Sequence, residues 1–175
     1  MRIASAAALS HAIPLAAPLQ RTLDAARRDA SAADCEFFTP HLLLALLRQK
    51  DSLAREAIDS VQRGLAKKIE DALSAYRARA QLGRYVDFDW RERKDIRAAQ
   101  VIAVRQGSSV VTAGHLLVAV LESTSNTQRW LVAQLGSDLV DSIKAKALTL
   151  RSVAARNVTP EITRSAPGLD LGHDD

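Results

Sequence analysis

Residues 38–47 read Phe38-Thr39-Pro40-His41-Leu42-Leu43-Leu44-Ala45-Leu46-Leu47, and residues 111–121 repeat this stretch as Val111-Thr112-Ala113-Gly114-His115-Leu116-Leu117-Val118-Ala119-Val120-Leu121. Aligning the two histidines gives an offset of 74 residues, which also places Leu65 on Leu139 and Ile69 on Ile143. Upstream, an offset of 73 places residues 23–26 on residues 96–99. Because apolar positions match on both sides of the motif, the sequence predicts a duplicated unit.

Each copy of the unit is typical of four short helices. The expected helices cover residues 22–32, 40–47, 53–60 and 65–76 in the first copy, and residues 96–106, 113–121, 127–135 and 139–150 in the second. Thr39 and Thr112 are expected to cap the two motif helices with their hydroxyls, and Pro40 suits the first helical position. The run from Leu42 to Leu47 is apolar nearly all round, which predicts a helix buried between others.

The composition agrees with a soluble helical protein. The chain has 175 residues, of which 47% are hydrophobic, 25% are charged and only 4% are aromatic. Few aromatic residues and much alanine disfavour an all-β fold. We therefore predict an all-α fold of eight short helices in two four-helix repeats related by a pseudo-twofold axis.

The predicted organisation has three parts. It consists of an N-terminal extension (1–18), a two-repeat domain (19–150, with repeat one at 19–76, a linker at 77–92 and repeat two at 93–150), and a flexible acidic tail (151–175). The alanine-rich start superficially looks like a signal peptide, but it is weakly hydrophobic and is interrupted by His11 and Pro14. We expect a cytoplasmic protein without a transmembrane helix, secretion or organelle import being the alternative.

The duplicated Thr-led, leucine-rich helix resembles the Clp N-terminal (Clp R) repeat domain of the Clp/Hsp100 unfoldases. The resemblance covers about residues 19–150, and the second copy is most similar to that of the A-type ATPase. It implies eight helices in two pseudo-symmetric repeats and a non-catalytic domain that docks adaptors or substrate polypeptides. The chain contains no G-x-x-x-x-G-K-[ST] phosphate-binding loop. We therefore expect either a free-standing Clp N-terminal domain or a paralogue that lacks the ATPase modules.

One departure from the family concerns the residue just before each motif histidine. The C-type pattern has a glutamate there in each repeat, suited to pairing with the guanidinium of phosphoarginine. This chain has Pro40 and Gly114 at those positions. Neither residue offers a carboxylate, so phosphoarginine binding of that type is not expected.

The candidate partner-binding residues lie in and after the linker. Residues 77–105 carry eight basic and four acidic side chains. This stretch is either a solvated helix face or an electrostatic landing surface for an acidic partner. Aromatic residues and arginine contribute much of the binding energy of protein interfaces, so Phe88 and Trp90 could contact a partner. They could equally fill the groove between the repeats. The candidates are Arg84, Phe88, Trp90, Arg91, Arg93, Lys94 and Arg97.

No catalytic, cofactor or metal site is predicted. A single cysteine, Cys35, and four scattered histidines do not match a zinc-ligand pattern. His41 and His115 recur without a recurring carboxylate or cysteine beside them, so we assign them a structural role at the start of each motif helix. Cys35 has no recurring His or Asp partner and is interpreted as a packed thiol.

The leading hypothesis is thus a protein-interaction domain whose partner is an adaptor, a substrate or a Clp ATPase. Two alternatives remain. A net charge of +4 allows a basic helical nucleic-acid binder, which would show steep salt dependence. An all-α hydrolase or transferase would require a pocket with convergent titratable groups. Oligomeric state is left open.

Overall fold

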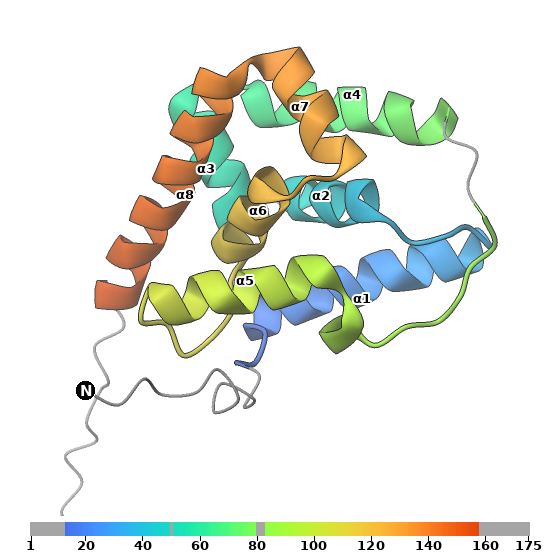
Figure 1. Ribbon diagram of the computed structural model, residues 1–175, viewed down its shortest axis with the longest axis horizontal. Helices are drawn as coiled ribbons and strands as arrows, with labels where there is room; N and C mark the ends of the chain where they lie inside the picture. Colours follow the sequence, from blue (N-terminus) through green and yellow to red (C-terminus); the bar gives the residue numbers. More distant parts are fainter. Residues whose placement is uncertain (1–12, 50, 80–82, 158–175) are drawn as a thin grey trace, which may run out of the picture.

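The computed structural model describes residues 13–49, 51–79 and 83–157, and in this part of the chain all regular structure is helical (Figure 1). The elements are α1 (Ala17–Ala32), α2 (Thr39–Arg48), α3 (Leu53–Val61), α4 (Leu65–Arg79), the short 3₁₀ helix η2 (Trp90–Glu92), α5 (Lys94–Arg105), α6 (Ala113–Glu122), α7 (Asn126–Leu135) and α8 (Ser137–Asn157). The only extended pairing within these residues is an isolated bridge between Leu15 and Val111. The all-α prediction is confirmed.

Two helices, α1 and α8, extend furthest beyond the ranges that the sequence pattern indicated. Helix α1 begins at Ala17, ahead of residue 22, because Pro18 is accepted in its first turn. Helix α8 continues to Asn157, past the position where the apolar pattern fades at residue 150. The start of the predicted tail, residues 151–157, is therefore helical. The rest of the tail, and residues 1–12 of the predicted extension, lie outside the described residues.

The two halves use the same set of internal contacts. In the first half α2 packs against α1, α3 and α4, and α3 packs against α4. In the second half α6 packs against α5, α7 and α8, and α7 packs against α8. Between the halves, α2 contacts α6, and α3 contacts both α6 and α8. The duplicated sequence thus folds into two equivalent units that meet along α2, α3, α6 and α8.

The motif helices α2 and α6 form the centre of the molecule, as Figure 1 shows. Leucines 42, 43, 46 and 47 of α2 are buried, and so are the equivalent positions 116, 117, 120 and 121 of α6. A helix that is apolar on nearly every side needs neighbours on every side. The surrounding helices supply them, with Leu23 and Leu73 in the first half and Ile96 and Ala147 at the matching positions of the second.

Each motif helix is capped by its histidine, and the prediction that a threonine occupies the cap position is wrong for Thr39 and confirmed for Thr112. The backbone N–H of Phe38 donates to Nδ1 of His41 at 3.2 Å, and the N–H of Thr112 donates to Nδ1 of His115 at 3.1 Å. Thr39 is already the first helical residue. Thr112 occupies the cap position, but its buried hydroxyl has no hydrogen-bond partner among the described residues. In each helix the histidine at the third helical position accepts the backbone N–H of the residue at the cap position. This is one of the two hydrogen bonds of a capping box.

The equivalence of the two units can be measured by matched truncations. Leu43 and Leu117 occupy corresponding positions and are each 1% exposed. We expect Leu43→Ala and Leu117→Ala each to lower the free energy of unfolding by about 2–5 kcal/mol. Urea unfolding monitored by circular dichroism measures both losses. A loss below about 1 kcal/mol at either site would contradict the proposed central position of that helix.

Candidate functional site

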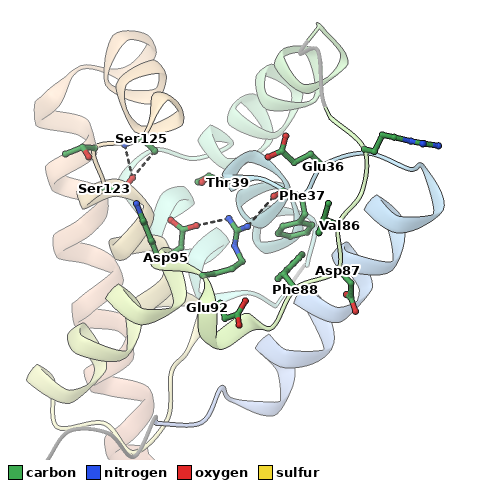
Figure 2. Close-up of a pocket in the computed structure, with 14 residues that line it drawn as sticks. Glu36, Phe37, Thr39, Val86, Asp87, Phe88, Glu92, Asp95, Ser123 and Ser125 are labelled. Atoms are coloured by element: carbon green, nitrogen blue, oxygen red, sulfur yellow. Dashed lines mark hydrogen bonds and ion pairs between the residues drawn. The ribbon is translucent and has the colours of Figure 1, made fainter. Parts of the chain in front are cut away.

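A surface groove lies between the linker, the loop before α2, the start of α5 and the α6–α7 loop. It has a volume of about 790 Å³. Figure 2 shows Phe37, Val86 and Phe88 on one side of it and Asp95, Ser123 and Ser125 on the other. We call it the linker groove; its lining residues are Glu36, Phe37, Thr39, Arg84, Val86, Asp87, Phe88, Glu92, Arg93, Lys94, Asp95, Ser123, Thr124 and Ser125.

Arg93 holds the walls of the linker groove together. Its Nη2 lies 3.0 Å from Oδ2 of Asp95, and its Nη1 donates to the carbonyl oxygen of Phe37 at 3.2 Å. The guanidinium carbon lies 5.2 Å from the centre of the Phe37 ring and 5.5 Å from that of Phe88, within cation–π range. The side chain is only 18% exposed. Arg93, predicted as a partner contact, is therefore committed to internal contacts.

The two predicted aromatic anchors join the linker to the first repeat. Trp90 is 6% exposed, and its Nε1 donates to Oδ1 of Asp24 in α1 at 3.0 Å. The Trp90 ring meets Phe37 and Phe88 edge-on, at centroid distances of 5.4 and 4.9 Å. Trp90 thus packs the linker against the first repeat, whereas Phe88 is half-buried and lines the linker groove. Trp90 in particular is buried and cannot touch a partner in this conformation.

Asp24 of α1 accepts the hydrogen bond that holds Trp90 in place. Burial by itself would raise the pKa of its carboxyl group, but hydrogen bonds from Gln20 and Trp90 and the charges of Arg27 and Arg28 outweigh burial and hold the pKa below its usual value. Arg27 also donates to the carbonyl oxygen of Phe88 at 3.2 Å. An ionised Asp24 thus keeps the linker fastened to α1 at neutral pH.

The remaining predicted cations differ in how far they are free to meet a partner. Nε of Arg84 lies 3.2 Å from Oδ2 of Asp34, and Nε of Arg91 lies 3.7 Å from Oδ2 of Asp89. Arg97 donates to the carbonyl oxygen of Glu92 at 2.9 Å. Lys94 is exposed and takes part in none of the ion pairs found among the described residues. The basic stretch is therefore partly neutralised by its own neighbours.

A second groove, of about 480 Å³, runs between α5 and α6 and continues the first. We call it the α5–α6 groove; it shares Lys94, Asp95, Ser123 and Thr124 with the linker groove and adds Ala98, Val101, Ile102, Arg105, Ala119 and Glu122. Val86 (75% exposed) lines the linker groove, and Val101 (49%) lines the α5–α6 groove. Val104 (41%) follows Val101 by one turn. The sequence reasoning did not select these valines, although apolar residues outside the buried stripe of α5 are the signal that could have found them.

Cys35 has a histidine partner that the sequence did not indicate. Its Sγ lies 3.7 Å from Nε2 of His41. Because Nδ1 of His41 accepts a backbone N–H, the neutral ring carries its proton on Nε2 and points it at the sulfur. Burial, together with the charges of Arg77 and Arg93, lowers the pKa of His41 to about 4. The imidazole is thus neutral at pH 7 and cannot take a proton from the thiol at Nε2.

The two positions where the C-type pattern has glutamate are closed in this structure. Pro40 is buried in the first turn of α2. A Cβ atom at Gly114 would lie 3.2 Å from the carbonyl oxygen of Ala147 in α8, tighter than ordinary packing. The close approach of α6 and α8 therefore explains why glycine is suited to position 114.

Within the described residues, no cluster of three or more His, Cys, Asp or Glu side chains is arranged to hold a metal ion. None of the helices that the structure describes combines the length and apolar character that a bilayer-spanning helix requires.

Comparison with known families agrees with this architecture. The family model of the Clp repeat (R) N-terminal domain matches residues 15–134. The chain belongs to this family. Its membership makes the chain a protein-interaction domain of the Clp system. The match is to the family as a whole, so the likeness to the A-type stays a prediction.

Among solved structures, the fold is similar to a chain from a study entitled "Coevolution of the ATPase ClpV, the TssB-TssC Sheath and the Accessory HsiE Protein Distinguishes Two Type VI Secretion Classes". The two share 21% sequence identity with a TM-score of 0.59, covering 92% of this chain and 99% of the other. At this identity the likeness concerns the fold. None of the curated proteins compared with this chain matches it.

The role assigned to Arg93 predicts a stability effect. Arg93→Met leaves the buried carboxylate of Asp95 without its partner, so we expect a loss of about 3 kcal/mol in the free energy of unfolding. Arg93→Met combined with Asp95→Asn should lose clearly less, because no unpaired charge remains. Urea titrations of the three proteins test this. An unchanged midpoint for Arg93→Met would show that the arginine does not fasten the linker.

The histidine cap predicts a pH dependence. The pKa of His41 is about 4 in the folded chain and near 6.5 when unfolded, so the unfolded state binds the proton first. Stability is fully present above pH 6.5 and falls as the pH drops towards 4, by at most about 1.4 kcal/mol per pH unit. His41→Gln keeps an acceptor for the Phe38 N–H without titrating. Its unfolding free energy, measured by urea titration between pH 7 and 4.5, should fall less steeply; equal slopes would contradict the assignment.

Proposed function

We propose that this chain is a non-catalytic docking domain that receives a protein partner of the Clp system along the linker and α5–α6 grooves. The partner would be an adaptor, a degradation substrate or a Clp ATPase. The observation that carries the proposal is that two exposed valines, Val86 and Val101, line two grooves that share four lining residues. Apolar side chains that line a surface groove contribute to binding when a partner removes them from water.

The mechanism we propose is recognition by shape with modest electrostatics. The scaffold under the grooves is rigidly joined, since Arg93 ties the linker wall to Asp95 and Trp90 ties it to Asp24. A preorganised surface loses less conformational entropy when a partner binds. The exposed cations around the groove, among them Lys94, would act mainly on the association rate.

Two observations weigh against the alternatives. The Cys35–His41 pair is held in the wrong tautomer for general-base activation of the thiol, which disfavours a cysteine-dependent enzyme. Arg84, Arg91 and Arg93 are paired with acidic neighbours, which reduces the number of cations in residues 77–105 that could replace counterions on nucleic acid. We therefore propose neither catalysis nor nucleic-acid binding, and we place the protein in the cytoplasm with the Clp system.

The test is affinity capture from native lysate by the immobilised full chain, with bound proteins identified by mass spectrometry. We expect a Clp ATPase or a protein that binds one, and we expect the double variant Val86→Asp, Val101→Asp to retain at least about tenfold less of it. Arg63→Glu, an exposed residue in the turn between α3 and α4, is the control. Capture that is equal for the double variant and the unmodified chain would exclude these grooves as the docking surface.

A further inference from the structure

We propose, resting on the docking function above, that the outward stripe of α5 selects a specific chemistry: an extended apolar segment of a partner protein with a carboxylate at each end. The stripe consists of Lys94, Ala98, Val101 and Arg105, all exposed and all lining the α5–α6 groove. It places two small apolar side chains between two cations.

The spacing of the stripe follows from helix geometry. Residues at positions i, i+4, i+7 and i+11 lie on one face of an α-helix. Lys94 and Arg105 are eleven residues apart, so their backbones are separated by about 16 Å along the axis at a rise of 1.5 Å per residue. An extended chain covers about the same distance in five residues. A partner segment of the form acid, four apolar residues, acid therefore matches the stripe.

The charges around the groove favour an acidic occupant at both ends. Neither Lys94 nor Arg105 belongs to any of the ion pairs within the described part of the chain. The carboxylate of Asp95 is already paired with Arg93 at 3.0 Å. Glu122, at the end of α6, is the other acidic residue of this groove. It opposes an acidic ligand, so the preference of the groove should strengthen when Glu122 is neutralised.

The first repeat provides an internal comparison for the valines. At the 73-residue offset, Val101 corresponds to Arg28 and Val104 to Ser31, and both of these α1 residues are exposed. The corresponding groove between α1 and α2 carries Asp29 where the α5–α6 groove carries Ile102. The fold therefore does not require apolar residues at these positions. Valine also favours a helix less than arginine does, so its presence on an exposed helix face is explained better by a contact with a partner.

The experiment uses three fluorescein-labelled peptides and the full chain, with binding followed by fluorescence anisotropy at low salt. The acidic peptide is Glu-Leu-Ala-Val-Leu-Glu, the basic peptide replaces both glutamates with lysine, and the third peptide, Leu-Ala-Val-Leu-Glu-Glu, has the same composition with adjacent carboxylates. We expect the acidic peptide to bind at least about tenfold more tightly than the basic one and several-fold more tightly than the third. Absence of binding by the acidic peptide up to 1 mM, or equal affinities for the first two, overturns the proposal.

Charge-swap variants make the test specific to the stripe. The double variant Lys94→Glu, Arg105→Glu should invert the preference, so that the basic peptide binds more tightly. Val101→Asp should weaken the acidic peptide about tenfold, and Glu122→Gln should tighten it a few-fold. The control is Arg21→Glu, Arg28→Glu, which reverses two exposed arginines of α1, of which Arg21 corresponds to Lys94, and it should not change the peptide preference. Thermal unfolding by circular dichroism shows that each variant is folded, and a preference that the Lys94→Glu, Arg105→Glu variant does not invert overturns the proposal.

The outcomes separate this inference from the docking function. If the captured Clp-system partner is retained by the Lys94→Glu, Arg105→Glu variant and by Val101→Asp, the stripe is not its site, while the docking function stands. If the peptide preference and its inversion are found but no Clp-system partner is captured, the selectivity stands and the Clp role fails. Self-association of the unmodified chain that Val101→Asp abolishes, measured by sedimentation, would assign the face to a second copy and overturn the proposal.

Discussion

Helices α2 and α6 can exist only if they are surrounded, because both are apolar on almost every side. Exposing such a helix to water costs roughly 25 cal/mol for each Å² of apolar surface. Each motif helix therefore packs against the three other helices of its own repeat. It also packs against the motif helix of the other repeat. The duplicated architecture, the meeting of the halves and the central position of the motif all follow from this requirement. The histidine caps serve the same end, since they satisfy a backbone N–H at the buried start of each helix.

The linker is the second element on which the surface depends. The Trp90 ring meets Phe37 and its Nε1 donates to Asp24 of α1, and Arg93 contacts both the carbonyl oxygen of Phe37 and the ring of Phe88. These contacts fasten the linker to the first repeat. A connection held in this way forms a wall of the groove. Under the proposed docking function, a partner would meet a preformed surface and would lose less conformational entropy on binding.

In a duplicated fold, the exposed residues of one repeat can differ from those of the other while both repeats keep the same buried core. Buried positions of the two repeats agree closely, as Leu43 and Leu117 illustrate, because both must satisfy the same packing. Exposed positions are under no such restriction, and it is there that the repeats diverge, with Arg28 in one and Val101 in the other. The chemistry that distinguishes a binding surface is therefore found by comparing the copies, in the places where their folds are equivalent and their side chains are not.

The periodic apolar pattern was enough to predict the helical class, the duplication and most of the helices, since burial of a repeating face is a local property of the sequence. It was not enough for the caps or the site. Thr39 looked like a cap by residue type, but the side chain that reaches the free N–H belongs to His41, and that depends on where the helix starts in space. Arg93 and Lys94 are adjacent and similar in charge, yet one is locked between two rings and an aspartate while the other is open to solvent. Neighbours brought together from distant parts of the chain determine such differences, and no local pattern encodes them.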